Sequence, residues 1–385
     1  MQTNKQKNVL IIISSLKKGG GAENVANYQS RLKKSFNVIY LTFYDHQNSY
    51  QPPAPVLCLN EKLTFNPFRQ ALKLLTRAKK IRKICQQHDI HVAIGHMEAS
   101  SLPMIIGLLG TKTSTIACIH NFLKRSYPSF WSRFFISILY SLANKLIFVS
   151  QGISRGILFY SFIKKKINVI YNAVDLNQFK CPSKLKKQFE QNSLKHRPVH
   201  LISVGRLHPQ KNYAHTLKAL SKLTIPFRYT IIGDGQLKRN LQAKIKNYHL
   251  SSSVKLAGPS NKINKILPKH DVFILNSLYE GFGIVLIEAM ASGLPVIATD
   301  CPYGPREIIA PNESQPIKPG QFFVAQYGIL IPVADTISLC KAIEFLVNHP
   351  KTYTKLQIAG CQRAKDFSLK RIIPQWETVI NDTLL

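Results

Sequence analysis

The stretch "YEGFGIVLIEAMASGLPVIATD", from Tyr279 to Asp300, joins a glycine-bearing loop, an apolar helix and an apolar strand. It carries two glutamates, Glu280 before the helix and Glu288 within it, in a chain with only 19 acidic residues. Glu288 stands among apolar neighbours, and a buried carboxylate is costly unless it is hydrogen-bonded. Ribose hydroxyls are suitable partners, as in other nucleotide folds. The stretch therefore predicts a nucleotide site beside a buried strand, the alternative being a helix cap and an isolated acid.

The same alternation of strand and helix continues on both sides of this stretch. Continuous apolar runs between helical patterns are typical of parallel strands buried on both faces. The runs fall at residues 8–14, 37–42, 91–96, 114–120, 145–150 and 167–172, and again at 199–205, 228–233, 253–258, 271–276 and 294–299. We therefore predict an α/β chain of two doubly wound, Rossmann-like domains. Such sheets bind ligands beyond the carboxyl ends of their strands, so we expect the site in a cleft between the two domains.

The domain boundaries follow from the gap between the two series of strands. The first domain is predicted at residues 1–180 and the second at 199–365. A polar, lysine-rich linker is expected at 181–198, where the strand pattern stops. Residues 366–385 are predicted to form a C-terminal helix that crosses back to the first domain.

The charge of the chain limits the classes of partner. Its 385 residues carry 52 Lys and Arg, a net charge of +33 that is spread over both halves. Such an excess favours polyanionic partners: nucleic acid, an anionic membrane or a phosphorylated substrate. A nucleic-acid-binding protein is the main alternative, but no recognition-helix or aromatic RNA-binding signature is present, and that function leaves Glu280 and Glu288 without a role. A dehydrogenase is excluded by the missing G-x-G-x-x-G pattern.

Cysteine usage and hydropathy indicate the compartment. The seven cysteines are scattered and contain no C-x-x-C, so we expect neither a disulfide framework nor a zinc site. The apolar run at 9–13 is too short for a signal peptide, and the tract at 134–143 is about half the length of a membrane span. These features predict a cytoplasmic chain that is able to touch a membrane.

Two loops that follow strands have the residues that hold phosphate groups. In "SLKKGGGAEN" (15–24), Gly20 and Gly21 allow backbone N–H groups to approach a ligand at the start of a helix. In "SVGRLHPQKN" (203–212), Gly205 frees the backbone while Arg206 and Lys211 suit a diphosphate. The alternatives are a plain turn in the first loop and two surface bases in the second.

Together these motifs resemble the family 4 retaining glycosyltransferases of the GT-B fold. The resemblance covers essentially the whole chain and includes "CIHN" at 118–121, "VIYNAVD" at 169–175 and the stretch from Tyr279 to Asp300. It implies that Glu280 contacts donor-sugar hydroxyls, that Glu288 contacts the ribose, and that Arg206 and Lys211 hold the donor diphosphate. It also assigns a position near the donor sugar and acceptor to His120. Backbone contacts are implied for the remaining site residues: Gly20, Gly21, Gly205, Gly281, Phe282 and Gly283.

The chain departs from the family pattern at Gly283, because the family often has proline there; the departure implies a looser loop. The stretch "TDCPYGPREII" (299–309), in which Gly304 and Pro305 predict a turn, is similar to relatives in lipopolysaccharide and capsule assembly. The resemblance thus implies retaining transfer of a hexose or N-acetylhexosamine from a UDP-sugar to a lipid-linked, lipopolysaccharide or capsular acceptor. A soluble acceptor is the alternative. No cofactor and no nucleic acid are expected, and no metal, because the chain lacks the D-x-D arrangement that holds a divalent ion on a donor diphosphate.

Two segments of the first domain predict docking on the cytoplasmic face of the plasma membrane. In residues 68–87 a basic helix stripe adjoins an apolar one; the basic residues are Arg69, Lys73, Arg77 and Lys80, and the apolar ones Leu72, Leu75, Ala78 and Ile81. The alternative for this helix is an apolar stripe on the sheet with its bases in water. The segment "FLKRSYPSFWSRFF" (122–135) mixes cations such as Lys124 and Arg125 with aromatic residues such as Trp131, which suits an anionic membrane surface.

Overall fold

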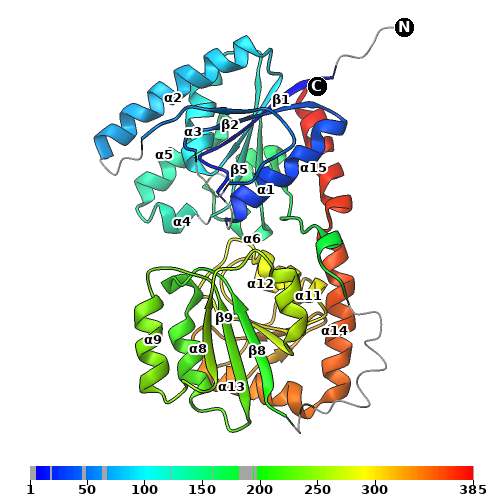
Figure 1. Cartoon of the computed structure of the whole chain (residues 1–385). Helices are drawn as coiled ribbons and strands as arrows, with labels where there is room; N and C mark the ends of the chain where they lie inside the picture. The colour runs from blue at the N-terminus through cyan, green and yellow to red at the C-terminus, as the bar shows by residue number, and fades with distance from the viewer. Residues whose placement is uncertain are drawn as a thin grey trace. The chain divides into compact units, whose positions relative to one another are not determined.

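The computed structural model describes residues 6–17, 20–45, 49–62, 67–121, 123–158, 160–181, 194 and 197–384. The chain forms two compact units, each built on a seven-stranded sheet (Figure 1). Unit 1 comprises Met1–Ala173 and Leu369–Leu385, and unit 2 comprises Val174–Ser368. The division thus falls at 173/174 and 368/369, a few residues from the predicted positions, and most of the expected linker lies outside the described residues.

The sheet of unit 1 is entirely parallel, in the order β3-β2-β1-β4-β5-β6-β7. Its interior strand β1 carries five consecutive aliphatic residues that are at most 1% exposed, which is why it has no polar face. The strands of unit 1 are β1 Asn8–Ile13, β2 Asn37–Thr42, β3 Val56–Cys58, β4 Val92–His96, β5 Ser114–Ile119, β6 Lys145–Phe148 and β7 Ile167–Val169.

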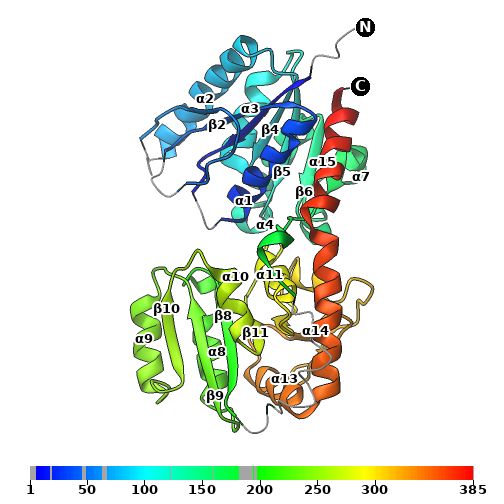
Figure 2. The same ribbon diagram turned by 45° about the vertical axis from the view of Figure 1, so that its right-hand side comes forward.

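Helices cover this sheet, and the last one comes from the far end of the chain. Helix α15 packs near β4 and β5, and its Trp376 is 1% exposed in the core (Figure 2). The helices of unit 1 are α1 Gly21–Gln29, α2 Pro67–Gln87, α3 Glu98–Leu108, α4 Leu123–Ser126, α5 Phe130–Ser141, α6 Gln151–Ser154, α7 Tyr160–Ile163 and α15 Leu369–Leu384, with short 3-10 turns η1 Ser30–Lys34 and η2 Lys164–Lys166.

Helix α2 differs from both descriptions that its sequence suggested. Arg77, expected on a solvated basic stripe, is 8% exposed; its guanidinium stacks on Phe43 and binds Glu61, with Nη2 2.8 Å from Oε2. Leu72 and Leu75, expected on the buried stripe, are 49% and 54% exposed. The ion pair accounts for the difference, because it lets a charged side chain occupy the inner face of the helix. Ala78 and Ile81 are buried, and the Arg69 side chain lies outside the described residues.

Unit 2 repeats the design with one antiparallel strand at its edge. The order is β10-β9-β8-β11-β12-β14-β13, and only β13 runs antiparallel to its neighbour. The strands are β8 Val199–Val204, β9 Phe227–Ile232, β10 Val254–Gly258, β11 Val272–Leu275, β12 Val296–Thr299, β13 Phe323–Val324 and β14 Ile329–Ile331. The helices are α8 Tyr213–Leu220, α9 Lys238–Asn247, α10 Ile263–Ile266, α11 Ile284–Ala291, α12 Pro305–Ile309, α13 Thr336–Asn348 and α14 Pro350–Ala364, with 3-10 turns η3 Leu176–Gln178, η5 Pro209–Lys211, η6 Leu267–Lys269 and η7 Lys365–Phe367.

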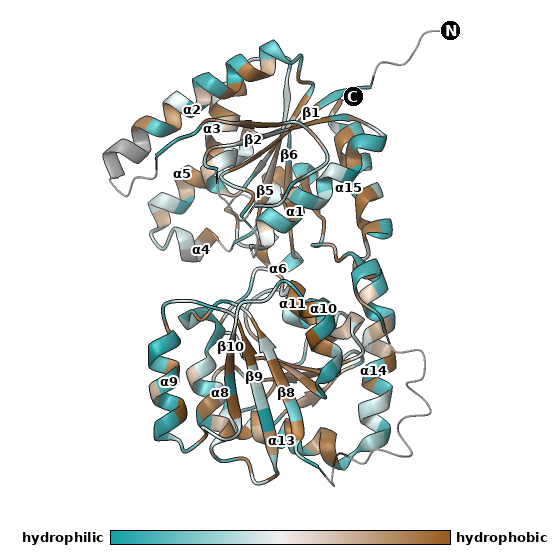
Figure 3. Cartoon of the chain, viewed as in Figure 1, coloured by the Kyte–Doolittle hydropathy of each residue, from teal (hydrophilic) through white to brown (hydrophobic). Residues whose placement is uncertain are grey.

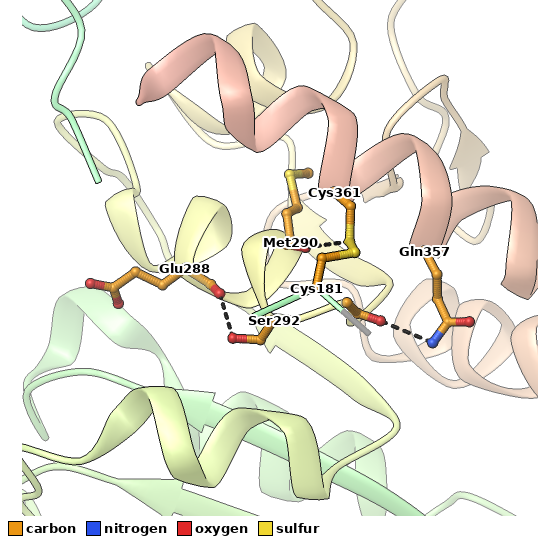
Figure 4. Close-up of a disulfide and its surroundings, with 7 residues drawn as sticks. Cys181, Glu288, Met290, Ser292, Gln357 and Cys361 are labelled. Atoms are coloured by element: carbon orange, nitrogen blue, oxygen red, sulfur yellow. Dashed lines mark hydrogen bonds between the residues drawn. A yellow bond between two sulfur atoms is a disulfide. The ribbon is translucent and has the colours of Figure 1, made fainter. Parts of the chain in front are cut away.

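A disulfide joins Cys181 to Cys361 of α14, a bridge that the scattered cysteines, from which no disulfide framework was expected, did not predict (Figure 4). The two cysteines are 180 residues apart, and the search for local spacings such as C-x-x-C does not detect so distant a pair. Helix α14 also holds α11 in place: Gln357 Nε2 donates to the Gly293 carbonyl at 2.9 Å, and the Cys361 sulfur lies 3.4 Å from the Met290 carbonyl oxygen. The disulfide therefore lies next to α11, the helix that carries Glu288.

Helix α5 exposes apolar side chains instead of polar ones. Its exposed residues are Phe130, Trp131, Phe135 and Ile138, and Figure 3 colours parts of this helix hydrophobic. Across the described parts of the chain, no helix combines the length and the apolar character that spanning a bilayer requires.

Candidate active site

The loop after β8 places Lys211 through a short, well-defined turn. Gly205 has a φ of +156°, and a Cβ there would lie 3.0 Å from the Lys211 side chain, so glycine makes room for it. The turn η5 begins with Pro209 and is capped by His208, whose Nδ1 accepts from the Gln210 amide at 3.3 Å. These contacts direct Lys211 toward the neighbouring strand β11.

Lys211 and Glu280, predicted from separate motifs, meet in an ion pair. Lys211 Nζ donates to Glu280 Oε1 at 2.7 Å, and the two side chains are 13% and 8% exposed. The loop backbones are also joined, because the Leu278 amide donates to the Gln210 carbonyl and Gln210 Nε2 donates to the Tyr279 carbonyl. The structure therefore brings these two predicted residues together at the carboxyl ends of adjacent strands.

Ser277 is a site residue that sequence reasoning missed. Its hydroxyl donates to Glu280 Oε1 at 2.6 Å, and its carbonyl accepts from Thr299 Oγ1 at 2.5 Å. Glu280 Oε1 thus receives two donors, while Oε2 makes no hydrogen bond with any described residue. A signal was available, because Ser277 follows the last strand residues and precedes Glu280 by three positions.

Glu288 lies on α11 in surroundings that disfavour its charge. Burial raises its pKa to about 7. Its carboxylate makes no hydrogen bond or ion pair within the described part of the chain, and in Figure 4 it points away from the disulfide. The side chain is therefore available to hydroxyl donors of a ligand.

The loop at 281–283 presents backbone and not side chains. Phe282 is 2% exposed and packs edge-on against Phe367, with ring centroids 5.4 Å apart. Gly283 is the N-cap of α11 and has a φ of +94°, a left-handed conformation that the proline implied there by the family resemblance cannot adopt. The Phe282 carbonyl would lie 2.1 Å from a Cβ on Gly304, so the next loop packs directly on this one.

Two arginines of unit 2, the predicted site residue Arg206 and Arg306 of the stretch at 299–309, have different surroundings. Arg206 is exposed and forms no ion pair with the residues that the structure describes. Arg306, by contrast, binds Asp300 through two hydrogen bonds of 2.8 and 2.5 Å, and its Nη1 donates to the Glu313 carbonyl at 3.0 Å. Arg306 therefore holds the chain after β12 in place, whereas Arg206 is open to a ligand.

The predicted residues of unit 1 lie at the carboxyl ends of its strands. Gly20 is the N-cap of α1 and Gly21 its first residue, so both are at the helix N-terminus, as expected for an anion-binding loop. His120 directly follows β5, is 8% exposed, and has a pKa lowered to about 4 by burial. It is neutral at pH 7.

No group of three or more His, Cys, Asp or Glu residues able to hold a metal occurs in the described part of the chain. The charged residues predicted for the site in unit 2 are Arg206, Lys211, Glu280 and Glu288, of which Lys211 and Glu280 are in direct contact.

Comparison with known proteins agrees with the fold. HepE of Anabaena in complex with UDP-glucose superposes with a TM-score of 0.77 at 19% identity, covering 97% of this chain and 99% of HepE. Two doubly wound units of this kind define the GT-B fold of glycosyltransferases, so the predicted fold class is confirmed.

Two family models match the chain in succession. "Glycosyltransferase Family 4" matches residues 19–178 and "Glycosyl transferases group 1" matches residues 185–363. The chain belongs to family 4 of the glycosyltransferases, as the motifs predicted.

Two curated relatives of this chain are bacterial glycosyltransferases. The N-acetylgalactosamine-N,N'-diacetylbacillosaminyl-diphospho-undecaprenol 4-alpha-N-acetylgalactosaminyltransferase of Campylobacter jejuni is 29% identical over 94% of this chain and 96% of its own length. The UDP-Gal:alpha-D-GlcNAc-diphosphoundecaprenol alpha-1,3-galactosyltransferase of Escherichia coli is 28% identical over 64% of this chain and 65% of its own length.

Proposed function

We propose that this glycosyltransferase moves a hexose or N-acetylhexosamine from a UDP-sugar to a lipid-linked acceptor, with retention of anomeric configuration and without a metal ion. The observation that carries the proposal is the Lys211–Glu280 ion pair at the ends of β8 and β11. It places a cation and a carboxylate side by side where α/β sheets bind their ligands.

Each of these two groups keeps binding capacity for a donor. Lys211 uses one of its three N–H donors on Glu280, which leaves two for diphosphate oxygens. Glu280 Oε2 has no partner within the described residues and is able to accept from sugar hydroxyls. Arg206 adds an exposed guanidinium, and Glu288 a free carboxylate for the ribose.

The transfer itself needs charge stabilisation more than a protein nucleophile. In our proposal the acceptor oxygen bonds to the anomeric carbon on the face from which the diphosphate departs. The acceptor proton passes to a leaving diphosphate oxygen, and UDP is released. Arg206 and Lys211 neutralise the charge that develops on the diphosphate, a role that a divalent ion fills elsewhere.

The relatives support the substrate classes. HepE was solved with UDP-glucose, and the name of the E. coli relative specifies UDP-Gal. The names of both curated relatives specify acceptors linked to undecaprenol through a diphosphate. A lipid-linked acceptor requires an enzyme that reaches a membrane surface.

Helix α5 offers such a contact, and we include an anionic membrane, on the cytoplasmic side, in the proposal. Every exposed residue of α5 is apolar, and with Leu142 beyond its end the stripe comprises Phe130, Trp131, Phe135, Ile138 and Leu142, at 37–64% exposure. Four of them repeat at spacings of four, three and four, so they share one helix face. Residues 1–180 contain 25 basic and 6 acidic side chains, which favours anionic headgroups. The side chains of Lys124 and Arg125 lie outside the described residues.

Product analysis tests the proposal. The protein is incubated with UDP-glucose, UDP-galactose, UDP-GlcNAc or UDP-GalNAc and either a membrane lipid extract or water-soluble glycans. We expect mass spectrometry to show one added sugar on a diphosphate-linked lipid, NMR to show an α-linkage from an α-linked donor, and EDTA to leave the rate unchanged.

Other results would contradict particular parts. A β-linkage would exclude retention, and a rate that is lost in EDTA and restored by Mg²⁺ or Mn²⁺ would exclude metal independence. Transfer to soluble glycans alone would identify the alternative acceptor. Absence of transfer, together with a salt-sensitive gel shift of nucleic acid, would favour the nucleic-acid-binding function.

A further inference from the structure

A buried chain of hydrogen bonds lies behind His120. His96 ends β4 and His120 follows the neighbouring β5, and their ring nitrogens, His96 Nδ1 and His120 Nε2, are 3.0 Å apart. On its other side, His96 Nε2 lies 2.7 Å from Oε1 of Gln29, the last residue of α1. Gln29 and His96 are both 0% exposed.

The direction of each hydrogen bond follows from the atoms involved. Burial holds the pKa of both histidines below its ordinary value, so at pH 7 each ring carries a single N–H. Gln29 Oε1 can only accept, which places the His96 proton on Nε2. His96 Nδ1 is then bare and accepts from His120 Nε2–H. His120 Nδ1 is therefore left without a proton, and it makes no hydrogen bond with any described residue.

The C-terminal helix isolates this chain of bonds from water. The Trp376 ring of α15 is 1% exposed, and its centroid lies 6.4 Å from that of His96. Water is thus a poor competitor for the His96 nitrogens, so the bonds that fix the proton positions are stronger than they would be at the surface. A neutral histidine at the surface would exchange between its two tautomers.

We propose that His96, held by Gln29, is a positioning residue that fixes His120 in the Nε2–H tautomer, so that His120 Nδ1 accepts a hydrogen bond from a hydroxyl of the bound sugar substrate. The contact of His120 with sugar rests on the proposed function; the tautomer does not. A bare Nδ1 repels phosphate oxygens, since neither group supplies a proton. His120 therefore recognises the hydroxyl-bearing part of a substrate and not its diphosphate.

The tautomer is measured directly on the whole protein. Long-range ¹⁵N–¹H NMR spectra of protein labelled with ¹⁵N-histidine distinguish protonated from bare ring nitrogens, and loss of one signal in His120→Gln assigns that residue. We expect Nε2–H with a bare Nδ1 for His120 at pH 7. An Nδ1–H tautomer, which would follow if Gln29 presented its N–H, or an imidazolium would overturn the proposal.

Two substitutions of His96 separate positioning from packing. In His96→Asn the amide oxygen takes the place of Nδ1 as acceptor, so we expect the His120 tautomer to be kept. In His96→Leu the acceptor is lost, and we expect a mixture of tautomers. Gln29→Met removes the oxygen that accepts from His96 Nε2–H, so His96 is no longer held in one tautomer. This variant provides the same test if His96→Leu does not fold.

Kinetics complete the test. Losing one hydrogen bond predicts a kcat/KM for the UDP-sugar reduced by about tenfold in His96→Leu and recovered in His96→Asn. The affinity for UDP, which lacks the sugar, should not change, and the exposed His88→Asn is the matched control. If the fixed tautomer is observed but kcat/KM is unaffected, the sugar contact of His120 is wrong. If no UDP-sugar is a substrate, the proposed function fails while the NMR result still decides the tautomer.

Discussion

Lys211 and Glu280 are 69 residues apart in sequence, yet Nζ of the one lies 2.7 Å from Oε1 of the other, with both side chains largely buried. We predict that Lys211→Ala and Glu280→Gln each lower the turnover of the UDP-sugar by about 10- to 100-fold. The reason is the loss of a charge-assisted hydrogen bond to the substrate, worth roughly 1.5–3 kcal/mol. Steady-state kinetics, with circular dichroism to verify the fold, provide the measurement.

The exposed Lys218 on α8 is the matched control, and Lys218→Ala should retain full turnover. Wild-type rates in a folded Lys211→Ala or Glu280→Gln variant would remove that residue from the site.

The same pair predicts a separation of stability from activity. Lys211→Ala leaves the Glu280 carboxylate buried without its cation, and we expect the free energy of unfolding to fall by about 3–5 kcal/mol. Lys211→Met combined with Glu280→Gln removes both charges, and its stability should return most of the way to that of the wild type. Its turnover should stay low, because the donor still lacks its partners. Urea unfolding and kinetics on the same samples test this, and a double variant no more stable than Lys211→Ala would contradict it.

Glu288 predicts a pH dependence of stability. Its pKa is raised from an ordinary value of 4.5 to about 7, so between these values the folded state binds more protons than the unfolded state. The contribution of this residue to stability is therefore present below pH 4.5 and is lost as the pH rises to 7, a change of up to about 3 kcal/mol. Glu288→Gln does not titrate, so relative to the wild type it should become more stable between pH 5 and pH 7.5 in urea unfolding.

If Glu288 binds the ribose, the more stable variant is also the weaker binder. Calorimetry at pH 7.5 should show a lower affinity of Glu288→Gln for UDP. Unchanged affinity would assign Glu288 to the core and not to the site.

Replacing Gly283 by alanine or proline is predicted to lower the stability of the fold. Its φ of +94° is strained for any side chain and inaccessible to proline, so we expect Gly283→Ala to lose about 1–2 kcal/mol of stability and Gly283→Pro to lose more. Both should lose turnover, because this loop starts the helix that carries Glu288.

Gly320 is the matched control, since it has a φ of +76° with no atom near its missing Cβ. Gly320→Ala should lose similar stability and keep its turnover. An equally active Gly283→Pro would show that the loop tolerates the conformation of its relatives.

The sequence was most informative about the strands of the two sheets. Long parallel strands buried on both faces are continuous apolar runs, and these were located to within a few residues. The strands β3, β13 and β14, which have two or three residues each, were missed. The predicted domain ends lie a few residues from the observed ones, Ala173 and Ser368.

Most contacts between side chains of distant segments were beyond sequence reasoning. The edge of the sheet on which Lys211 and Glu280 stand was predictable, but their direct pairing was not. The Cys181–Cys361 disulfide was missed because spacing rules see only near neighbours, and the burial of Arg77 because its partner Glu61 precedes the helix. His96 ended a predicted strand beside that of His120, so their contact could have been inferred from strand order.

The apolar face of α5 gives the last prediction. Trp131 and Phe135 are 64% and 61% exposed, and moving such side chains from water into a membrane interface contributes roughly 1–2 kcal/mol each. Lys124 and Arg125 should add about 1 kcal/mol each on an anionic surface. We expect the protein to co-sediment with phosphatidylglycerol vesicles, less in high salt, and to bind at least about 30-fold more weakly when Lys124, Arg125 and Trp131 are replaced together. The replacement of Ile337 by serine on α13 is the control, because Ile337 is 57% exposed and lies on a helix of unit 2, outside both segments predicted to dock. If that control weakens binding equally, the vesicles bind exposed apolar side chains without preference for α5. Equal binding to neutral vesicles, or no binding to anionic ones, would exclude α5 as a docking face for anionic membranes.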